Sequence, residues 1–423
     1  MRYPQYFSNL LEICQELKTS EQLLLPLCAA ENVTSPFAQI PLDSFLQEKY
    51  IMGGVNDYQY SNNFVGSEKL FSIYELLQSQ CKKLYDSEYA DPRTLSGVNA
   101  VTALMMSLFS AGDKILLYEE DCGGHGSMAK ICHRLGLKCL YVPFDYSNFD
   151  IDYEATNMII DSEKISGILL CPSDIIKVPR LNRLNLRNAI LIFDATQILG
   201  LIACNVIENP FDWFSAEDKF IMLGATHKTL PGPTCGLIMT KNKKLADQFD
   251  TKINPDYLRN VQMHHIVSLL LALMELEVFG KEYSSLIISN ANILAEHLSV
   301  MDFSALSIGE RFTDTHQIFL SMDKSHATPF MEKCGNYGIS LNYRERKIYR
   351  PSGIRIGTQQ VSRFGWGAEE MAQIAEVLYL IKANHISEDI LKQKIINLTQ
   401  KKTIKYTFDS SLYKTMYDCL HNC

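Results

Sequence analysis

Lys228 lies in a polar stretch that follows an apolar run. Residues 219–223 are apolar and of strand length, and residues 224–233 read Gly-Ala-Thr-His-Lys-Thr-Leu-Pro-Gly-Pro. We therefore expect a strand to deliver Thr226, His227 and Lys228 onto a turn at the rim of a sheet. A lysine held and partly desolvated there is a candidate amine nucleophile for carbonyl chemistry. The alternative is a solvated loop lysine, since most lysines are exposed.

Asp194 directly follows a second apolar run, residues 189–193. An acid at the carboxyl end of a buried parallel strand lies where open α/β sheets bind ligands. The alternative for Asp194 alone is a helix cap or a turn residue. A strand-end aspartate followed along the chain by a strand-end lysine indicates a pyridoxal phosphate site. In such a site the lysine forms a Schiff base, and the aspartate pairs with the pyridinium nitrogen.

Two glycine-containing turns could complete such a site. Ser96 and Gly97 open an apolar helical stretch, where free backbone N–H groups and the helix dipole favour a phosphate. A plain helix cap is the alternative. His125 lies on the glycine-rich turn 121–127, after the apolar run 114–118. A histidine there can stack on a flat cofactor, or it is a simple turn residue.

Arg355 lies inside an apolar, strand-like stretch, residues 352–358, where an unpaired guanidinium would be costly. Its planar fork matches a substrate carboxylate, and a structural ion pair is the alternative. Nearer the N-terminus, residues 49–60 are rich in glycine and tyrosine and have neither helical nor strand periodicity. A loop of this kind is either functional or an ordinary surface loop.

Strand-length apolar runs alternate with helix-length segments along the chain, which predicts a mostly parallel sheet flanked by helices. The expected strands are 114–118, 138–144, 165–171, 189–193 and 219–223, an antiparallel edge strand at 235–240, and small-domain strands at 316–321 and 353–357. The expected helices are 5–18, 68–84, 261–279, 283–300, 368–384 and 386–401. The expected domains are an arm at 1–25, a large cofactor domain at 26–285 and a small C-terminal domain at 286–423.

The composition is that of an ordinary globular protein, because 47% of the 423 residues are hydrophobic and the net charge is −8. Nucleic acid is not expected as a partner, since no basic block is present. No apolar run approaches the roughly 18 residues of a membrane helix, and no leader is recognisable, so we expect a cytoplasmic protein without a membrane partner. The twelve cysteines include no CxxC pair. We expect reduced, buried thiols, including Cys14, Cys28 and Cys81.

Together these stretches resemble the fold type I pyridoxal phosphate enzymes, specifically the serine hydroxymethyltransferase family. The strongest points are Ala-Glu-Asn at 30–32, Gly-Gly-His at 123–125, Thr-His-Lys at 226–228 with Gly-Pro at 232–233, and Gly-Ile-Arg-Ile-Gly-Thr at 353–358. Residues 226–233, 277–283 and 312–317 are most similar to L-threonine transaldolases. The resemblance implies an aspartate aminotransferase-like α/β fold, a smaller α/β C-terminal domain and pyridoxal 5'-phosphate as cofactor.

The resemblance also implies roles for the candidate residues. Lys228 would form the Schiff base, Asp194 would keep the pyridine nitrogen protonated, and His125 would stack on the ring. With His227, these residues form the implied catalytic set. The implied cofactor contacts are Ser96, Gly97, Val98, His125, Ser173, Asp194, Gln197, Thr226 and Lys228.

On the substrate side, the resemblance implies that Arg355 clamps the substrate carboxylate, with Tyr50 beside it. Glu31 belongs to the same implied substrate set. Tyr60 would face the active site of the neighbouring subunit, since these enzymes are homodimers with shared active sites.

Four positions depart from the hydroxymethyltransferase pattern. Met52 stands where the family has an acid/base glutamate two residues after its tyrosine, and a methionine cannot move a proton. Ala30 replaces a serine, Gln197 replaces the histidine of an Asp-x-x-His motif, and Thr234 replaces an arginine. The cofactor residues are therefore kept, while the residues for folate-linked proton chemistry are replaced.

We therefore expect a folate-independent transferase that cleaves or exchanges the Cα–Cβ bond of a small β-hydroxy-α-amino acid, threonine or serine, through a glycyl quinonoid. An aldehyde would be the second substrate, and His227, a tyrosine or a water could accept the hydroxyl proton. Alternatives are a serine hydroxymethyltransferase with a modified site, or racemisation, transamination or decarboxylation. A pseudoenzyme scaffold is a further alternative, and the intact Lys228, Asp194, His125 and Arg355 argue against it.

Overall fold

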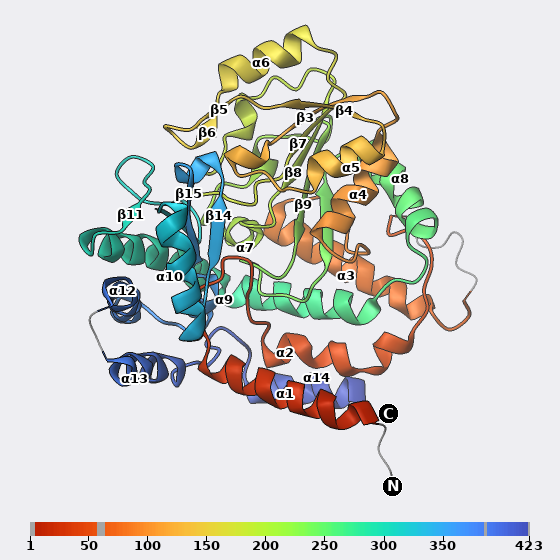
Figure 1. The fold of residues 1–423 in the computed structure, drawn as a ribbon. Coiled ribbons are helices and arrows are strands. Elements are labelled where there is room, and N and C mark those ends of the chain that lie inside the picture. The colour runs from red at the N-terminus through yellow and green to blue at the C-terminus, as the bar shows by residue number, and fades with distance from the viewer. Residues whose placement is uncertain (1–4, 57–63, 385–386, 422–423) are drawn as a thin grey trace.

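The computed structural model describes residues 5–56, 64–384 and 387–421, and a seven-stranded sheet forms its centre (Figure 1). The strands lie in the order β2-β10-β9-β8-β7-β3-β4, and from β9 to β4 all neighbours are parallel, as the apolar runs predict. The strands are β2 (Tyr89–Asp91), β3 (Lys114–Leu117), β4 (Lys138–Tyr141), β7 (Gly167–Leu170), β8 (Ile190–Asp194), β9 (Phe220–Ala225) and β10 (Gly236–Thr240).

Helices cover both faces of this sheet. They are α3 (Glu68–Tyr85), α4 (Gly97–Leu108), α5 (Met128–Arg134), α6 (Tyr153–Ser162), α7 (Leu199–Ala203), α8 (Lys243–Thr251) and α9 (Met263–Val300), and the short α2 (Pro36–Gln39) packs on α9. Alternate strand residues face opposite sides because the strand period is two. In β9, Ile221 and Leu223 pack in the buried cluster of α4, α5 and α8, whereas Phe220 and Met222 pack in that of α3, α7 and α9. The result is a three-layer α/β architecture.

Two predicted strands differ from the structure. The strand predicted at 235–240 is β10, which is antiparallel as expected but is not an edge strand, because the short β2 pairs with its other side. Residues 138–144 do not form one strand, since β4 ends at Tyr141. The next strand, β5 (Phe144–Asp145), pairs with β6 (Asp150–Ile151) in a separate hairpin. Pro143 lies at the break and has no N–H to donate to a sheet.

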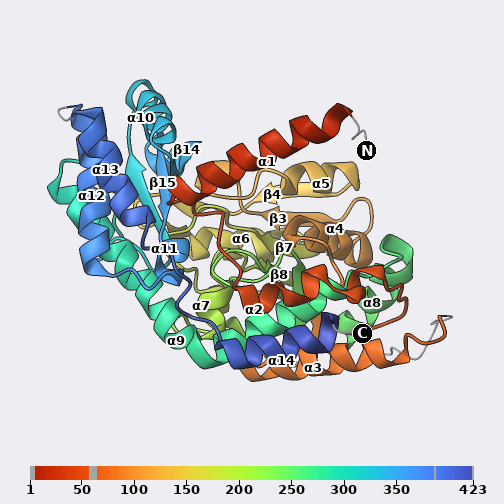
Figure 2. The ribbon, with the colours of Figure 1, turned by 90° about the horizontal axis from the view of Figure 1, so that it is seen from below.

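Helix α9 runs beneath both halves of the molecule (Figure 2). The sequence predicts two helices at 261–279 and 283–300, but the structure has one continuous helix through Gly280. A Cβ on Gly280 would collide with the thiol of Cys204, so this glycine permits close packing rather than ending a helix. The first part of α9 packs under the central sheet, and its last part belongs to the core of the C-terminal region.

Helix α9 is also long and apolar enough to cross a membrane, contrary to the expectation that no apolar run approaches that length. However, 67% of its apolar window is buried inside the fold. A helix that is apolar on most sides and packed inside the protein is typical of the core of a large globular domain. We therefore regard α9 as a core helix that joins the two hydrophobic cores.

The C-terminal region is built on a four-stranded sheet in the order β11-β12-β15-β14 (Figure 1). Its strands are β11 (Ser304–Ala305), β12 (Gln317–Ser321), β14 (Asn342–Glu345) and β15 (Ser352–Gly357). Its helices are α10 (Lys324–Asn336), α11 (Gln359–Arg363), α12 (Ala368–Ala383) and α13 (Glu388–Thr399). The last helix, α14 (Ser410–His421), instead packs on α2 and belongs to the core of the central sheet. The predicted strands at 316–321 and 353–357 are present, whereas the domain boundaries at 25 and 285 stay predictions.

The N-terminal helix α1 (Gln5–Leu23) extends beyond the predicted 5–18 and is largely exposed (Figure 2). After it, β1 (Leu25–Pro26) pairs with β13 (Ile339–Ser340), so the chain enters the fold beside the C-terminal region. Cys14 on this helix is exposed, contrary to expectation, while Cys28 and Cys81 are buried. The exposed apolar side chains of α1 are Tyr6, Phe7, Leu10, Leu11, Ile13, Leu17 and Leu23.

Arg93 ties the loop around residues 49–56 to the edge of the central sheet. Its fully buried guanidinium bridges Asp91 at 2.6 Å and Asp250 at 2.6 Å, and it donates to the carbonyl of Gly53 at 2.9 Å. Asp250 in turn accepts from the backbone N–H of Val55 at 2.8 Å. The loop that the sequence marks by its glycines and tyrosines is thus held by a buried ionic network.

We predict that Arg93→Met lowers the free energy of unfolding by about 3–5 kcal/mol, because it leaves two buried carboxylates without a counter-charge. Denaturant unfolding monitored by circular dichroism measures this change. Lys82→Met is the control, since it breaks the exposed Lys82–Glu88 pair and should change stability little. Equal effects of the two variants would contradict a structural role for the Arg93 network.

Candidate active site

Lys228 lies on the loop that follows β9, as the sequence predicts. The loop is closed by a backbone hydrogen bond of 2.8 Å from Gly232 N–H to the carbonyl of Thr226. The side chain of Asn32 donates to the carbonyl of Lys228 and, at 2.8 Å, to the hydroxyl of Tyr283. The Ala-Glu-Asn stretch near the N-terminus therefore fixes the backbone of the lysine, a role that the sequence alone did not reveal.

A cavity of about 200 Å³ opens beside Lys228, at the carboxyl edge of β8 and β9. These strands are parallel neighbours, so Asp194 and the Lys228 loop reach the same edge. The cavity gathers most of the predicted site residues and adds Pro172, Thr196 and Ala225. Its full lining is Ser96, Gly97, Val98, His125, Pro172, Asp194, Thr196, Gln197, Ala225, His227 and Lys228.

The start of α4 forms one wall of the cavity. Ser96 caps the helix by accepting from the N–H of Asn99 at 3.3 Å. In the described part of the chain, the backbone N–H groups of Gly97 and Val98 have no hydrogen-bond partner. The first N–H groups of an α-helix have no acceptor within the helix, so these two can bind a ligand. A Cβ on Gly97 would lie 3.1 Å from the Cβ of Ala225, so a larger residue would crowd the approach of the helix start to β9. This wall suits a phosphate group.

Asp194 is the last residue of β8 and is 8% exposed. It accepts from the backbone N–H of Thr196 at 2.9 Å. Burial raises the pKa of Asp194, whereas the Thr196 hydrogen bonds and the charge of Lys228 oppose that rise. A pyridinium N–H in the cavity would bring a further opposite charge and favour the ionised carboxylate.

Burial lowers the pKa of Lys228 to about 8, and the nearby Arg355 charge adds to the effect, while Asp194 opposes it. At neutral pH an appreciable fraction of the amine is therefore neutral and nucleophilic. An exposed lysine has a far smaller neutral fraction. The partly desolvated amine proposed from the sequence is thus present in the structure.

His125 is held by a turn that requires glycine. Gly123 has a φ of +99°, and a Cβ there would collide with the carbonyl of Asp174. At Gly124 a Cβ would lie 2.5 Å from the carbonyl oxygen of Tyr118. The N–H of His125 donates to the carbonyl of Cys171 at 2.9 Å, which places the imidazole over the cavity edge. Burial lowers the pKa of His125, so the ring is neutral at pH 7 and suited to stacking.

His227 also lines the cavity and is partly buried. Its Nδ1 atom is buried and has no hydrogen-bond partner among the described residues. Burial, and then the charge of Lys228, lower the pKa of His227, so the imidazole is neutral at pH 7. A neutral imidazole with a free nitrogen beside the reactive lysine is a candidate proton acceptor.

Arg355 on β15 is 2% exposed and forms an ion pair of 2.8 Å with the fully buried Asp174. Its Nη1 also donates to the carbonyl of Ser173 at 2.9 Å, and its Nη2 donates to Asn342 at 2.9 Å. Of the five N–H donors of a guanidinium, these bonds use three. The Nε–H and one Nη2–H remain, and they are the pair that a carboxylate accepts side-on. The structural ion pair considered from the sequence is therefore real and leaves a carboxylate-binding edge.

Three further predicted cofactor residues make contacts with the protein itself. The hydroxyl of Thr226 is buried and donates to the carbonyl of Pro233 at 2.5 Å. Ser173 lies between Pro172, which lines the cavity, and Asp174, and its carbonyl accepts from Arg355 and Gln317. Gln197 lines the cavity and accepts from Gln317 at 3.0 Å.

The predicted substrate residues near the N-terminus do not meet Arg355 within this chain. Tyr50 is 41% exposed, and its ring packs on Phe64 with centroids 4.6 Å apart. Glu31 is exposed, and its carbonyl, not its carboxylate, accepts from Gln359. Tyr60 lies outside the described residues.

Asp174 and Gln317 are not predicted as site residues by the sequence, although both lie close to the cavity. Gln317 joins Gln197, Ser173 and the N–H of Ile175, so it links β12 to the cavity wall. Asp174 contacts arginines about 170 to 180 positions away. Neither residue stands in a local pattern that predicts such partners, and only the folded chain reveals them.

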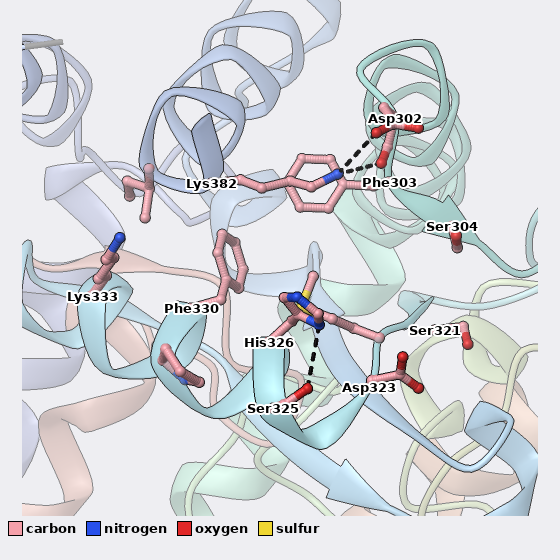
Figure 3. A pocket seen from close by; sticks show the side chains of 13 residues that line it. Asp302, Phe303, Ser304, Ser321, Asp323, Ser325, His326, Phe330, Lys333 and Lys382 are labelled. Carbon is pink, nitrogen blue, oxygen red and sulfur yellow. Dashed lines mark hydrogen bonds and ion pairs between the residues drawn. The ribbon is translucent and has the colours of Figure 1, made fainter. Parts of the chain in front are cut away.

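A larger cavity of about 460 Å³ lies in the C-terminal region between β12, α10 and α12 (Figure 3). Its floor is aromatic, formed by Phe303 and Phe330, and charged side chains stand at its rim. The ammonium of Lys382 contacts the carboxylate of Asp302 at 3.6 Å. None of the predicted site residues lines this cavity, so we place the chemistry at the smaller one.

The residues at the smaller cavity fit pyridoxal phosphate. The helix start with free N–H groups suits the phosphate, and the buried carboxylate of Asp194 suits the ring nitrogen. The amine of Lys228 suits the aldehyde carbon, and the imidazole of His125 suits the ring face. All four features line one cavity.

Comparison with known proteins agrees with this geometry. A family model described as serine hydroxymethyltransferase matches residues 5–378. The serine hydroxymethyltransferase of Archaeoglobus fulgidus is 30% identical, covering 96% of each chain, and that of Methanothermobacter marburgensis is 29% identical, covering 97% of this chain and 98% of the other. The crystal structure of L-threonine transaldolase from Pseudomonas fluorescens, in the internal aldimine state, superposes with a TM-score of 0.90 over 98% of both chains at 22% identity. The predicted fold type I architecture is thus confirmed.

We predict that the apoprotein binds pyridoxal phosphate faster as pH rises toward about 8, the pKa of Lys228. The neutral amine is the nucleophile, so the rate should rise about tenfold per pH unit well below that pKa and level off above it. Stopped-flow absorbance of the reconstituting enzyme measures the rate. A rate that still rises from pH 9 to 10 would mean that Lys228 titrates as an ordinary exposed lysine.

Proposed function

This chain belongs to the serine hydroxymethyltransferase family, and from that premise we propose that it exchanges the aldehyde part of a β-hydroxy-α-amino acid without folate. The chain is a pyridoxal-phosphate-dependent transferase with aldol-type chemistry on serine or threonine. Our finer proposal is an L-threonine transaldolase reaction. Threonine loses acetaldehyde, and the remaining glycyl unit is joined to a second aldehyde.

The bound cofactor supplies an electron sink for the carbanion left when the Cα–Cβ bond breaks. Asp194 would hold the pyridine nitrogen protonated, and His125 would cover one face of the ring. The free donors of Arg355 would orient the substrate carboxylate. The free Nδ1 of His227 would accept the β-hydroxyl proton, since that imidazole is neutral and borders the cavity.

Two replaced acid/base positions, Met52 and Gln197, carry the proposal. Among the described residues that line it, Asp194 is the only carboxylate, and it faces the ring nitrogen in this scheme. The acid/base glutamate of the hydroxymethyltransferases is Met52 here, and their Asp-x-x-His histidine is Gln197. Retro-aldol cleavage of threonine requires a base and an electron sink, which remain. Folate-linked hydroxymethyl transfer requires further acid/base groups, which are replaced.

We also propose that the chain works as a homodimer with shared active sites. The exposed apolar side chains of α1 form a surface that a second copy could cover. Tyr50 is exposed rather than directed at the Arg355 of its own chain, which suits a residue that serves the partner's site. Sedimentation velocity tests this proposal, and a monomer at micromolar concentration with full activity would contradict it.

We predict that the enzyme releases acetaldehyde from L-threonine, and that an added aromatic aldehyde yields a new β-hydroxy-α-amino acid. Conversion of serine with tetrahydrofolate should be weak, since the loss of one acid/base group costs about 10²–10⁴-fold in rate. A coupled acetaldehyde assay and mass analysis of the amino acids measure both reactions. Efficient folate-dependent conversion of serine without acetaldehyde from threonine would instead make the chain a serine hydroxymethyltransferase.

We predict that Arg355→Lys weakens amino-acid binding by about 1.5–3 kcal/mol, because lysine keeps the charge but loses the side-on pair of donors. Titration of the holoenzyme with threonine, followed by absorbance, measures the change. Since Arg355 also pairs with Asp174, thermal unfolding must be recorded as a control for the lost buried ion pair. A folded variant with unchanged amino-acid affinity would assign Arg355 a purely structural role.

A further inference from the structure

Three arginines surround one buried carboxylate at the edge of the candidate site. Asp174 lies 2.8 Å from Arg355, 2.5 Å from Arg346 and 3.2 Å from Arg344. Its side chain is fully buried, so a single internal negative charge faces three positive ones. The carboxylate of Glu120 contacts Arg346 at 3.2 Å but is 60% exposed. The cluster is therefore rich in positive charge, and an anionic ligand would stabilise it.

The three arginines differ in how many partners they already have. Arg346 uses both terminal nitrogens, on Asp174, Glu120 and the carbonyl of Gly124. Arg355 keeps one carboxylate-binding edge, which the proposed function assigns to the amino-acid substrate. Arg344 approaches Asp174 only through Nε, and no hydrogen bond occupies its two terminal nitrogens in the described part of the chain. The two terminal nitrogens of Arg344 are thus available to a ligand.

The sheet geometry places the guanidinium group of Arg344 beside that of Arg355. Strands β14 and β15 are antiparallel, with Asn342 opposite Arg355 and Arg344 opposite Gly353. Residues two apart on a strand share a face, so both arginines project from the same face of the sheet. Their common contact with one oxygen of Asp174 confirms this. Opposite Arg344, Gly353 has no side chain that would separate the two guanidinium groups.

Arg344 is also within electrostatic reach of the reactive groups. Its side chain is 25% exposed, less than an ordinary surface arginine but enough to meet a ligand. Its positive charge contributes to the lowered pKa of both Lys228 and His125, although burial is the main cause for each. An anion held by Arg344 would therefore lie close to the place where the second aldehyde must arrive.

We propose that Arg344 is a specificity-determining residue that binds an anionic group, a carboxylate or a phosphate, on the acceptor aldehyde. The inference rests on the proposed transaldolase function. In the reaction, the Cα–Cβ bond of threonine breaks and acetaldehyde leaves. A new bond then forms between Cα and the carbonyl carbon of the acceptor, and the new alkoxide takes up the proton that the threonine hydroxyl gave to the base. The product is a β-hydroxy-α-amino acid with a second anionic group.

The test compares matched charged and neutral acceptors with the holoenzyme and L-threonine. The carboxylate pair is 4-carboxybenzaldehyde and its methyl ester, and the phosphate pair is 4-formylphenyl phosphate and 4-methoxybenzaldehyde. The readout is the ratio of kcat/KM for the charged and neutral members of each pair. The variants are Arg344→Met, Arg344→Lys and the control Arg180→Met, in which an exposed arginine paired with Glu208 is lost.

We expect the wild type to prefer the charged member of at least one pair, and the pair with the larger ratio identifies the anion. Arg344→Met should lower that ratio about 10- to 100-fold, because it removes hydrogen bonds to a charged group and their free energy corresponds to a change of that size. Arg344→Lys should retain part of the preference, and Arg180→Met should leave the ratio unchanged. Thermal unfolding and cofactor content confirm that the variants are folded.

Two results would overturn the assignment of Arg344. One is a wild type that releases acetaldehyde but shows no preference for charged acceptors. The other is an Arg344→Met variant whose ratio is unchanged while its KM for threonine rises, which would make Arg344 part of the amino-acid clamp. A wild type that yields neither acetaldehyde nor coupled product would instead overturn the proposed function, so the two failures are distinguishable.

Discussion

The buried carboxylate of Asp174 holds the C-terminal sheet against the carboxyl edge of the central sheet. It pairs with Arg355 on β15 and Arg346 between β14 and β15, while its own N–H donates to the carbonyl of Gly123, in the turn that carries His125. Removing one partner of a buried ion pair leaves an uncompensated charge, which is strongly destabilising. Asp174 therefore binds Arg355 through its carboxylate and the turn that carries His125 through its backbone, so one residue ties the two together.

Burial also determines the protonation states of the residues in the candidate site. Burial keeps Lys228 partly neutral and keeps the imidazoles of His125 and His227 neutral at pH 7. Burial also disfavours the charge of Asp194 and raises its pKa, whereas the Thr196 hydrogen bonds oppose that rise. A nucleophilic amine, neutral imidazoles and a buried carboxylate in one cavity are what carbanion chemistry on a bound pyridine ring requires.

The sequence reveals those parts of the site that depend on local pattern. Asp194 and Lys228 each follow an apolar run, so the strand ends and their shared edge were predictable. The three residues of β2 are too few for a periodic pattern, so the sequence predicts β10 as an edge strand. The helix end predicted near Gly280 is wrong, because that glycine allows close packing against Cys204 and does not end the helix. Asp174 and Arg344 could not be predicted, since their partners come from distant segments that only the folded chain brings together.

The central claim is that Lys228 carries the cofactor at the edge shared with Asp194. Borohydride reduction of the holoenzyme, followed by digestion and mass spectrometry, tests it most directly, because reduction makes the bond between cofactor and amine permanent. The account predicts one pyridoxyl group, on the peptide that contains Lys228, and none in Lys228→Ala treated in the same way. A pyridoxyl group on a different lysine of the wild type would contradict the account.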